Sequence, residues 1–393
     1  MKKILLLFLG AVVLVSCTDE DDNGNIIGIE TETNSYFLRS SSDGTSIGEV
    51  ILENNGDNTI TINILVEEPN FEEALQVHLH AATAAEGGPE LLTLNNVDPE
   101  TGISSTTFSS WNDGTEAVYE QLMIIDGYID VHFPEEGGIY AFSDIGFNEL
   151  TGTSQVYNFI PLNNSEVEGT ITLEKRLDNT TLVTVNLTNP SPSAQYAAFI
   201  YEDNALDGVN SLFQFGNFNE SVSYTQLESF SEGTEITFDE LLIIDGHIKL
   251  FETINGVTTE IANADIGNNL LTENSEEYTV IAQNDSGIDG SILVQERING
   301  EAILTITLYG FDSETTYSVV LFTGEMESTE EASTVISLNP IDGANGVSMT
   351  NLSSTEDLEM GFDTFTGFDG HVRIISTEDN LIVASGNIGL NAE

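Results

Sequence analysis

Short segments in which β-branched or apolar residues alternate with Thr or Asn recur along this chain. Clear examples lie at 59–64, 182–187 and 303–308. Successive side chains of a strand point to opposite sides, so this alternation is typical of strands with one buried and one solvated face. No long window shows the period of about 3.6 residues that marks an amphipathic helix. The pattern therefore predicts an all-β protein.

The strand pattern belongs to a repeat of 121 residues. Tyrosine and glycine landmarks recur at this interval: Tyr36, Tyr157 and Tyr278, and Gly48, Gly169 and Gly290. An Asp-Gly landmark follows later in each copy, at 126–127, 245–246 and 369–370. Landmarks in the same order indicate tandem duplication. We expect three domains of ordinary size, at 34–154, 155–275 and 276–393.

Turn residues separate the predicted strands within each copy. The chain has 34 glycines, and Asn-Gly pairs at 55–56 and 299–300 favour tight hairpins. Many short strands joined by such turns are typical of antiparallel sandwiches. We expect each copy to be an antiparallel, Ig-like β-sandwich of about seven or eight strands.

The N-terminus has the composition of a secretory signal. Two lysines precede the apolar run 4–15, which is too short to cross a bilayer. Residues 14–17, Leu-Val-Ser-Cys, resemble a bacterial lipobox, in which the cysteine receives a diacylglyceryl group and the chain is cut before it. Cys17 is the only cysteine, so no disulfide can form within the chain. We expect a lipoprotein signal peptide at 1–16 and a lipidated Cys17 that opens an acidic tether at 17–33.

The residues directly after Cys17 are strongly acidic. The run Asp-Glu-Asp-Asp at 19–22 resembles the signal that sends lipoproteins of the Bacteroidetes to the outer face of the outer membrane. We therefore expect a protein held in the outer membrane by its lipid anchor and facing the cell exterior. An ordinary solvated tether would have the same composition.

Net charge excludes one class of partner. The chain carries 66 acidic and 8 basic residues, for a formal net charge of −58. Nucleic-acid binding needs clustered Lys and Arg that displace counterions, so we expect no nucleic-acid partner. Because 40% of the residues are hydrophobic, the chain can still fold around apolar cores.

The first repeat carries three histidines in a pattern that suits a metal ion. His78 and His80 are two residues apart on a predicted strand, so they share a face. If the predicted strand that ends at His132 lies beside them, three imidazoles converge, and zinc or copper suits such ligands. A hydrogen-bonded cluster of structural histidines is the alternative.

The other two repeats provide a test of the metal hypothesis. The positions that match the three histidines are apolar or aromatic: Phe199, Tyr201, Phe251, Val320, Phe322 and Ile375. We therefore expect the histidine positions to face inward. The same alignment places His247 and His371 at the position of Tyr128, where we expect the strand surface.

Four segments of the first repeat match one known family. They are Val-His-Leu-His-Ala-Ala at 77–82, the Gly-rich stretch 86–92, Gly-Tyr-Ile-Asp-Val-His at 127–132, and Gly-Gly-Ile-Tyr at 137–140. Together they resemble the chordin-type CHRD domain, although the Glu-Ile-Arg element of that family is replaced at the end. The resemblance implies a sandwich distantly like Cu,Zn superoxide dismutase, found in extracellular proteins and without a settled activity. Dismutase activity itself would need a larger histidine set than one repeat of this chain contains.

No coherent catalytic set is apparent in the sequence. Residues 44–48 fit the Gly-x-Ser-x-Gly pattern, but a predicted strand follows instead of the helix that a nucleophile elbow requires. The leading hypothesis is a non-enzymatic cell-surface lipoprotein with an interaction or structural role and an unidentified protein or glycan partner. The second hypothesis is a zinc- or copper-binding domain in the first repeat through His78, His80 and His132.

Overall fold

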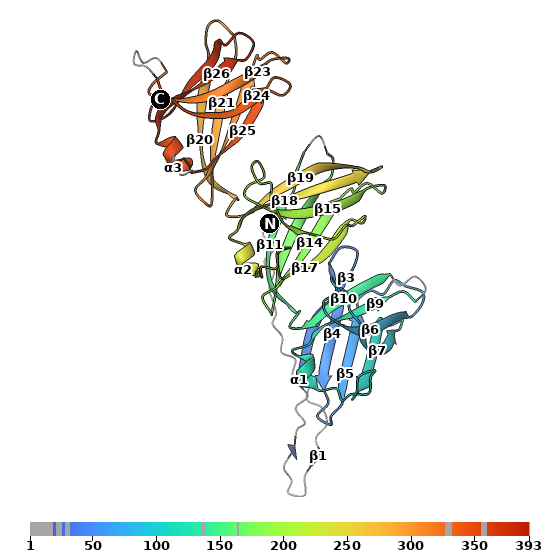
Figure 1. Ribbon diagram of the computed structural model, residues 1–393. Coiled ribbons are helices and arrows are strands. Elements are labelled where there is room, and N and C mark those ends of the chain that lie inside the picture. Colours follow the sequence, from blue (N-terminus) through green and yellow to red (C-terminus); the bar gives the residue numbers. More distant parts are fainter. Residues whose placement is uncertain are drawn as a thin grey trace, which may run out of the picture. The chain divides into compact units, whose positions relative to one another are not determined.

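The computed structural model describes residues 19–20, 26–27, 32–134, 138–162, 165–326, 332–354 and 360–392 (Figure 1). The predicted signal peptide at 1–16, the lipidation site Cys17 and most of the tether at 17–33 lie outside these residues. Strands dominate the described chain, so the all-β prediction is confirmed. Its helices are short: α1 (Tyr119–Leu122), α2 (Phe238–Leu241) and α3 (Phe362–Thr366). Among the described residues, no helix has the length and apolar character needed to cross a membrane.

The strands of the first repeat form one antiparallel sheet. Its order is β7-β6-β9-β10-β3-β4-β5-β8, and two short strands, β1 and β2, pair with each other before it. The bounds are β1 (Asp19–Glu20), β2 (Ile26–Ile27), β3 (Glu32–Ser40), β4 (Ser46–Asn54), β5 (Ile60–Val66), β6 (Leu75–Ala81), β7 (Glu90–Val97), β8 (Ile103–Phe108), β9 (Asp126–His132) and β10 (Ile139–Gly146).

The second repeat divides its strands between two sheets, as in a sandwich. One sheet has the order β11-β13-β14-β17 and the other β12-β19-β18-β15-β16. The bounds are β11 (Leu150–Asn158), β12 (Ile160–Pro161), β13 (Glu168–Arg176), β14 (Thr181–Thr188), β15 (Gln195–Glu202), β16 (Ser211–Gln214), β17 (Val222–Leu227), β18 (Asp245–Ile254) and β19 (Val257–Gly267).

The strands of the third repeat form a closed barrel with the order β20-β21-β22-β25-β24-β23-β26-β27. The bounds are β20 (Leu271–Ala282), β21 (Asp289–Arg297), β22 (Ala302–Tyr309), β23 (Thr316–Thr323), β24 (Thr334–Asp342), β25 (Val347–Leu352), β26 (Asp369–Ser376) and β27 (Ile382–Gly389).

Elements follow one another in a common order in the three repeats. In each, a short helix precedes the strand that begins with the Asp-Gly landmark. This strand pairs on one side with the strand of the His-x-His positions and on the other with the last long strand: β9 with β6 and β10, β18 with β15 and β19, and β26 with β23 and β27. The order confirms that the sequence repeat is also a repeat of secondary structure.

The chain divides into two compact units. Unit 1 comprises Met1–Ser154, Glu174–Thr184 and Tyr224–Gln226, and unit 2 comprises Gln155–Leu173, Val185–Ser223 and Leu227–Glu393. Segments of the second repeat belong to both units, and the predicted boundaries at 154/155 and 275/276 fall inside β11 and β20. The division into three domains therefore stays a prediction.

The repeated glycines have a steric cause. A Cβ atom on Gly48 would overlap the main-chain carbonyl oxygen of Leu65 on the neighbouring strand. The same overlap would occur at Gly169 and at Gly290. Only glycine lets the two backbones come this close, which explains why the residue recurs every 121 positions.

A buried arginine recurs in the two later repeats. In unit 1, Arg176 is fully buried and its guanidinium lies 2.7 Å from Asp144 Oδ2. Asp144 Oδ1 also accepts a hydrogen bond of 2.8 Å from the backbone N–H of Ala84. Both buried charges are therefore compensated, as burial requires.

The arginine cluster has a counterpart 121 residues later, within unit 2. Arg297 is 1% exposed and lies 2.6 Å from Asp265 Oδ2, and Asp265 Oδ1 accepts from the N–H of Ala205. At the two ends of the series, Asn55 stands at the arginine position and Asn387 at the aspartate position. In both pairs the arginine comes from one repeat and the aspartate from the repeat before it. The two positions that have no such neighbouring repeat carry asparagine.

Candidate metal-binding site

The histidines of the first repeat lie on two paired strands. His78 and His80 belong to β6, and β9 runs antiparallel beside it with His78 opposite Asp130 and Gln76 opposite His132. Residues at alternate positions and their cross-strand neighbours share a face of a sheet. The register therefore brings His78, His80, Asp130 and His132 onto one face, as the spacing predicted for the three histidines.

This face is not the one that packs into the hydrophobic core. Along β6, the core residues Val77 and Leu79 are fully buried and alternate with His78 and His80, whose side chains are 17% and 15% exposed. The prediction that the histidine positions face inward is wrong. The matching aromatic residues, such as Phe199, are likewise only partly buried, so their apolar character marked a covered sheet face rather than the core.

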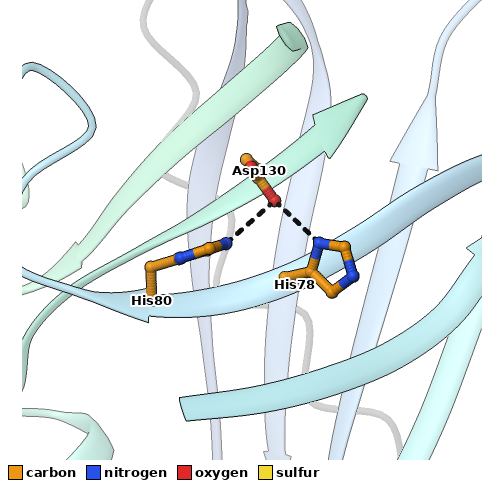
Figure 2. A group of neighbouring side chains, drawn as sticks. All are labelled: His78, His80 and Asp130. Atoms are coloured by element: carbon orange, nitrogen blue, oxygen red, sulfur yellow. Dashed lines mark ion pairs between the residues drawn. The ribbon is translucent and has the colours of Figure 1, made fainter. Parts of the chain in front are cut away.

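Three ligand atoms converge at this place, as Figure 2 shows. Asp130 Oδ1 lies 3.6 Å from His78 Nδ1 and 3.4 Å from His80 Nε2. All three atoms lie within 4.8 Å of one another. Bonds of about 2.0–2.1 Å to a tetrahedral zinc ion place its ligand atoms about 3.3 Å apart. The two distances from Asp130 Oδ1 are close to this value.

His132 is next to this group. Its Nε2 atom lies 3.0 Å from His78 Nδ1, and the two rings stack with centroids 4.9 Å apart. The Nδ1 atom of His132 lies 3.1 Å from the carbonyl oxygen of Phe133 and donates to it, because a carbonyl only accepts. This leaves a lone pair on Nε2, directed toward His78.

Asp130 completes the cluster, and the sequence analysis missed it. It lies two residues before His132 on the same strand, the spacing that relates His78 to His80. The period-two argument could therefore have identified it. Among 66 acidic residues, however, nothing in composition distinguishes this one.

Two buried acceptor atoms face each other in the cluster. His80 Nδ1 donates to the carbonyl oxygen of Gly88 at 2.9 Å, so Nε2 of the neutral ring carries a lone pair. Neither His80 Nε2 nor Asp130 Oδ1 has a hydrogen-bond partner within the described chain, and both atoms are buried. An unsatisfied buried polar atom costs about 1–3 kcal/mol. A cation between these atoms, either a metal ion or a proton on His80, would remove that cost.

The remaining histidines show which part of this arrangement is unusual. His247 and His371 are fully buried, so the prediction of surface positions is wrong. Each donates through Nδ1 to a carbonyl oxygen, of Asp203 and Gly324 respectively, and stacks on an aromatic ring of the neighbouring strand. Burial lowers the pKa of both rings, which favours their neutral form.

The carboxylate distinguishes the first repeat from the others. The Nε2 atoms of His247 and His371 also lack hydrogen-bond partners in the described chain, so an unpartnered nitrogen alone is not specific to a metal site. The position of Asp130 is occupied by Lys249 in the second repeat and by Arg373 in the third. Among the described residues, only the first repeat brings two imidazoles and a carboxylate together with ligand atoms within 4.8 Å of one another.

No known protein family and no curated protein matches the chain. The CHRD resemblance therefore gains no support beyond the residues that suggested it and stays an interpretation of the sequence.

Proposed function

We propose that the first repeat binds a divalent transition-metal ion through His78 Nδ1, His80 Nε2 and Asp130 Oδ1, with His132 as a fourth ligand. The observation that carries this proposal is the pair of buried acceptors, His80 Nε2 and Asp130 Oδ1, which lie 3.4 Å apart without hydrogen-bond partners in the described chain. A metal ion accepts a lone pair from each of them at once.

The ligand set favours zinc or copper(II). Imidazole nitrogens suit both metals, whereas calcium and magnesium prefer shells made of oxygen. The described residues include no cysteine, so the described part of this site offers no thiolate to favour copper(I). The strong negative charge of the chain also raises the local concentration of cations.

Two of the proposed ligands are held by main-chain carbonyl groups in a way that suits metal binding. The Gly88 carbonyl fixes the tautomer of His80, and the Phe133 carbonyl does the same for His132. Such outer contacts orient imidazole ligands and set which nitrogen binds the metal. His78 Nδ1 and His132 Nε2 share one proton, so for both atoms to bind a metal ion His78 must carry its proton on Nε2 instead.

Titration of the full-length chain, purified in detergent, with zinc, copper(II) and calcium tests the site by calorimetry. We expect micromolar or tighter binding of zinc or copper(II) and much weaker binding of calcium. The isosteric change Asp130→Asn should weaken transition-metal binding by roughly tenfold or more, and His80→Ala should do the same.

His371→Phe is the matched control for this titration. It removes an equally buried, unpartnered imidazole nitrogen that has a cation at the position of Asp130. Its metal affinity should equal that of the wild type. Equal affinity in the wild type and in Asp130→Asn would contradict the proposal.

We further propose that this site belongs to a non-enzymatic lipoprotein of the outer membrane. The lipobox at 14–17 and the acidic run at 19–22 support a lipid anchor on Cys17 and exposure to the exterior. Incorporation of labelled fatty acid should disappear in Cys17→Ala. Protease added to intact cells should digest the wild-type protein, and protection from it would contradict the outward orientation.

A further inference from the structure

The second repeat has a hollow on the sheet face that corresponds to the metal site. Its volume is about 310 Å³, and it lies on strands β15, β16, β18 and β19 with the segment that follows β16. Phe199, Tyr201 and Phe251 are among the aromatic residues that line it. The ring of Phe199 stands perpendicular to that of Phe251, with centroids 5.5 Å apart.

One of the residues that line the hollow has a small side chain. Ala197 lies directly across from Phe251 in the register of β15 and β18, and Phe199 is its next neighbour on the same face of β15. In the first repeat the matching position holds Gln76, a much longer side chain. The second repeat thus combines a small floor residue with large aromatic walls.

Unengaged amide groups surround the aromatic rings. Gln195, Gln214 and Asn217 line the hollow and are exposed, and the described hydrogen bonds include no partner for any of their side chains. The hydroxyl groups of Thr253 and Thr258, which also line it, are 2.8 Å apart. A ligand in the hollow therefore meets several free donors and acceptors beside an apolar surface.

The lining carries no charged side chain, although the chain as a whole has a formal charge of −58. Lys249 lies over the outer part of the same face, 5.0 Å from the ring centroid of Tyr201, and pairs with Glu260 at 3.7 Å. Because a cation already faces this ring, a second cation in the hollow would be repelled. Because Glu260 compensates Lys249, an anion gains little either. The site suits a neutral ligand.

We propose that the second repeat binds a neutral saccharide in this hollow. A sugar ring has an apolar C–H face that packs on Phe199 and Phe251, and hydroxyl groups at its rim that exchange hydrogen bonds with Gln195, Gln214 and Asn217. A purely apolar ligand would leave these amides without partners. An extended peptide would need a free strand edge for main-chain pairing, whereas the hollow lies on the face of the sheet.

Calorimetric titration of the full-length chain in detergent with four neutral oligosaccharides tests the proposal: maltohexaose, cellohexaose, mannohexaose and xylohexaose. At least one should bind with a Kd below about 1 mM. Choline and polygalacturonate serve as cationic and anionic probes and should not bind at this site. The saccharide proposal does not depend on metal binding in the first repeat.

Two variants taken from the other repeats locate the binding. Ala197→Gln fills the floor with the residue of the first repeat, and Phe251→His replaces one wall with the residue found there. Each should weaken saccharide binding roughly tenfold or more, because either the space or the stacking surface is lost. Ile375→His, at the matching position of the third repeat, is the control and should leave affinity unchanged.

Ala197→Gln decides the outcome even if Phe251→His does not fold, because residue 197 lies on the open face, where a longer side chain causes no core clash. The proposal is overturned if none of the four oligosaccharides binds, or if Ala197→Gln binds them as tightly as the wild type. It is also overturned if choline or polygalacturonate binds in a manner that Ala197→Gln abolishes.

Discussion

The first and second repeats build the same pair of strands and use it for different chemistry. In each, alternate residues of the first strand, such as Leu79 in β6 and Ile200 in β15, are fully buried in the core. The other face differs at four corresponding positions: His78, His80, Asp130 and His132 in the first repeat, and Phe199, Tyr201, Lys249 and Phe251 in the second. The core face of each strand thus sets the fold, while the opposite face is free to acquire a site.

The position of Asp130 carries a charged residue in every repeat, and the sign of the charge suits the side chains around it. Asp130 lies among imidazole nitrogens, whereas Lys249 lies over the ring of Tyr201, where a cation is favoured. The third repeat follows the second, with Arg373 4.4 Å from the ring centroid of Phe322. The first repeat is therefore the departure from a pattern that the other two share.

The first and second repeats each supply the aspartate of a buried arginine–aspartate pair, and Asp144→Ala tests this contact in the first repeat. The change leaves the buried charge of Arg176 without its carboxylate, which should lower the free energy of unfolding of unit 1 by about 3–5 kcal/mol. Chemical denaturation followed by the fluorescence of Trp111, the only tryptophan, measures the loss within unit 1.

Asn387→Ala is the matched control for this contact. Asn387 Oδ1 accepts a hydrogen bond from the N–H of Met326 at 2.9 Å, as Asp144 does from Ala84, but the arginine is not part of the contact. Its loss should lower the free energy of unfolding of unit 2 by only about 1 kcal/mol, the value of an ordinary hydrogen bond. Hydrogen exchange of the β27 amides measures it, because Trp111 belongs to unit 1. Similar losses in the two variants would show that the arginine contributes nothing to the scaffold.

A second prediction exchanges the two faces. The combined variant His78→Phe, His80→Tyr, Asp130→Lys and His132→Phe gives the first repeat the residues of the second. Zinc at about 100 times its Kd should stabilise the wild type by about 2.7 kcal/mol, because the ion binds only the folded state. The variant should gain nothing. Denaturation curves with zinc or with a chelator, followed by the fluorescence of Trp111, measure the difference. An equal gain in both proteins would contradict metal binding by these four residues.

The sequence predicted the strands, the repeat and the shared face of His78 and His80, because all three follow from local periodicity. It failed on which face is buried. Apolar residues at matching positions, such as Phe199, predict a core position, yet a sheet face covered by its own aromatic side chains has the same composition. The two-residue spacing places Asp130 on the same face as His132, but its position opposite His78 depends on the register between β6 and β9, which no local pattern specifies.

Burial of the histidines that stack on aromatic rings leads to the smallest predicted effect, a dependence of stability on pH. Burial is the largest cause of the lowered pKa of His247, and it outweighs the hydrogen bond to the Asp203 carbonyl, which acts in the opposite direction. The unfolded chain therefore takes up a proton at a higher pH than the folded chain does. Above the ordinary histidine pKa of about 6.5 the two states bind equally and the group has no effect.

As the pH falls below that value, the unfolded state of the second repeat gains protons before the folded state does. The free energy of unfolding therefore declines. One such site changes the slope by at most about 1.4 kcal/mol per pH unit. Hydrogen exchange of the β18 amides between pH 7.5 and 5.5, corrected for intrinsic rates, measures this slope, and His247→Phe should make it shallower. An unchanged slope would mean that the buried imidazole does not titrate on unfolding.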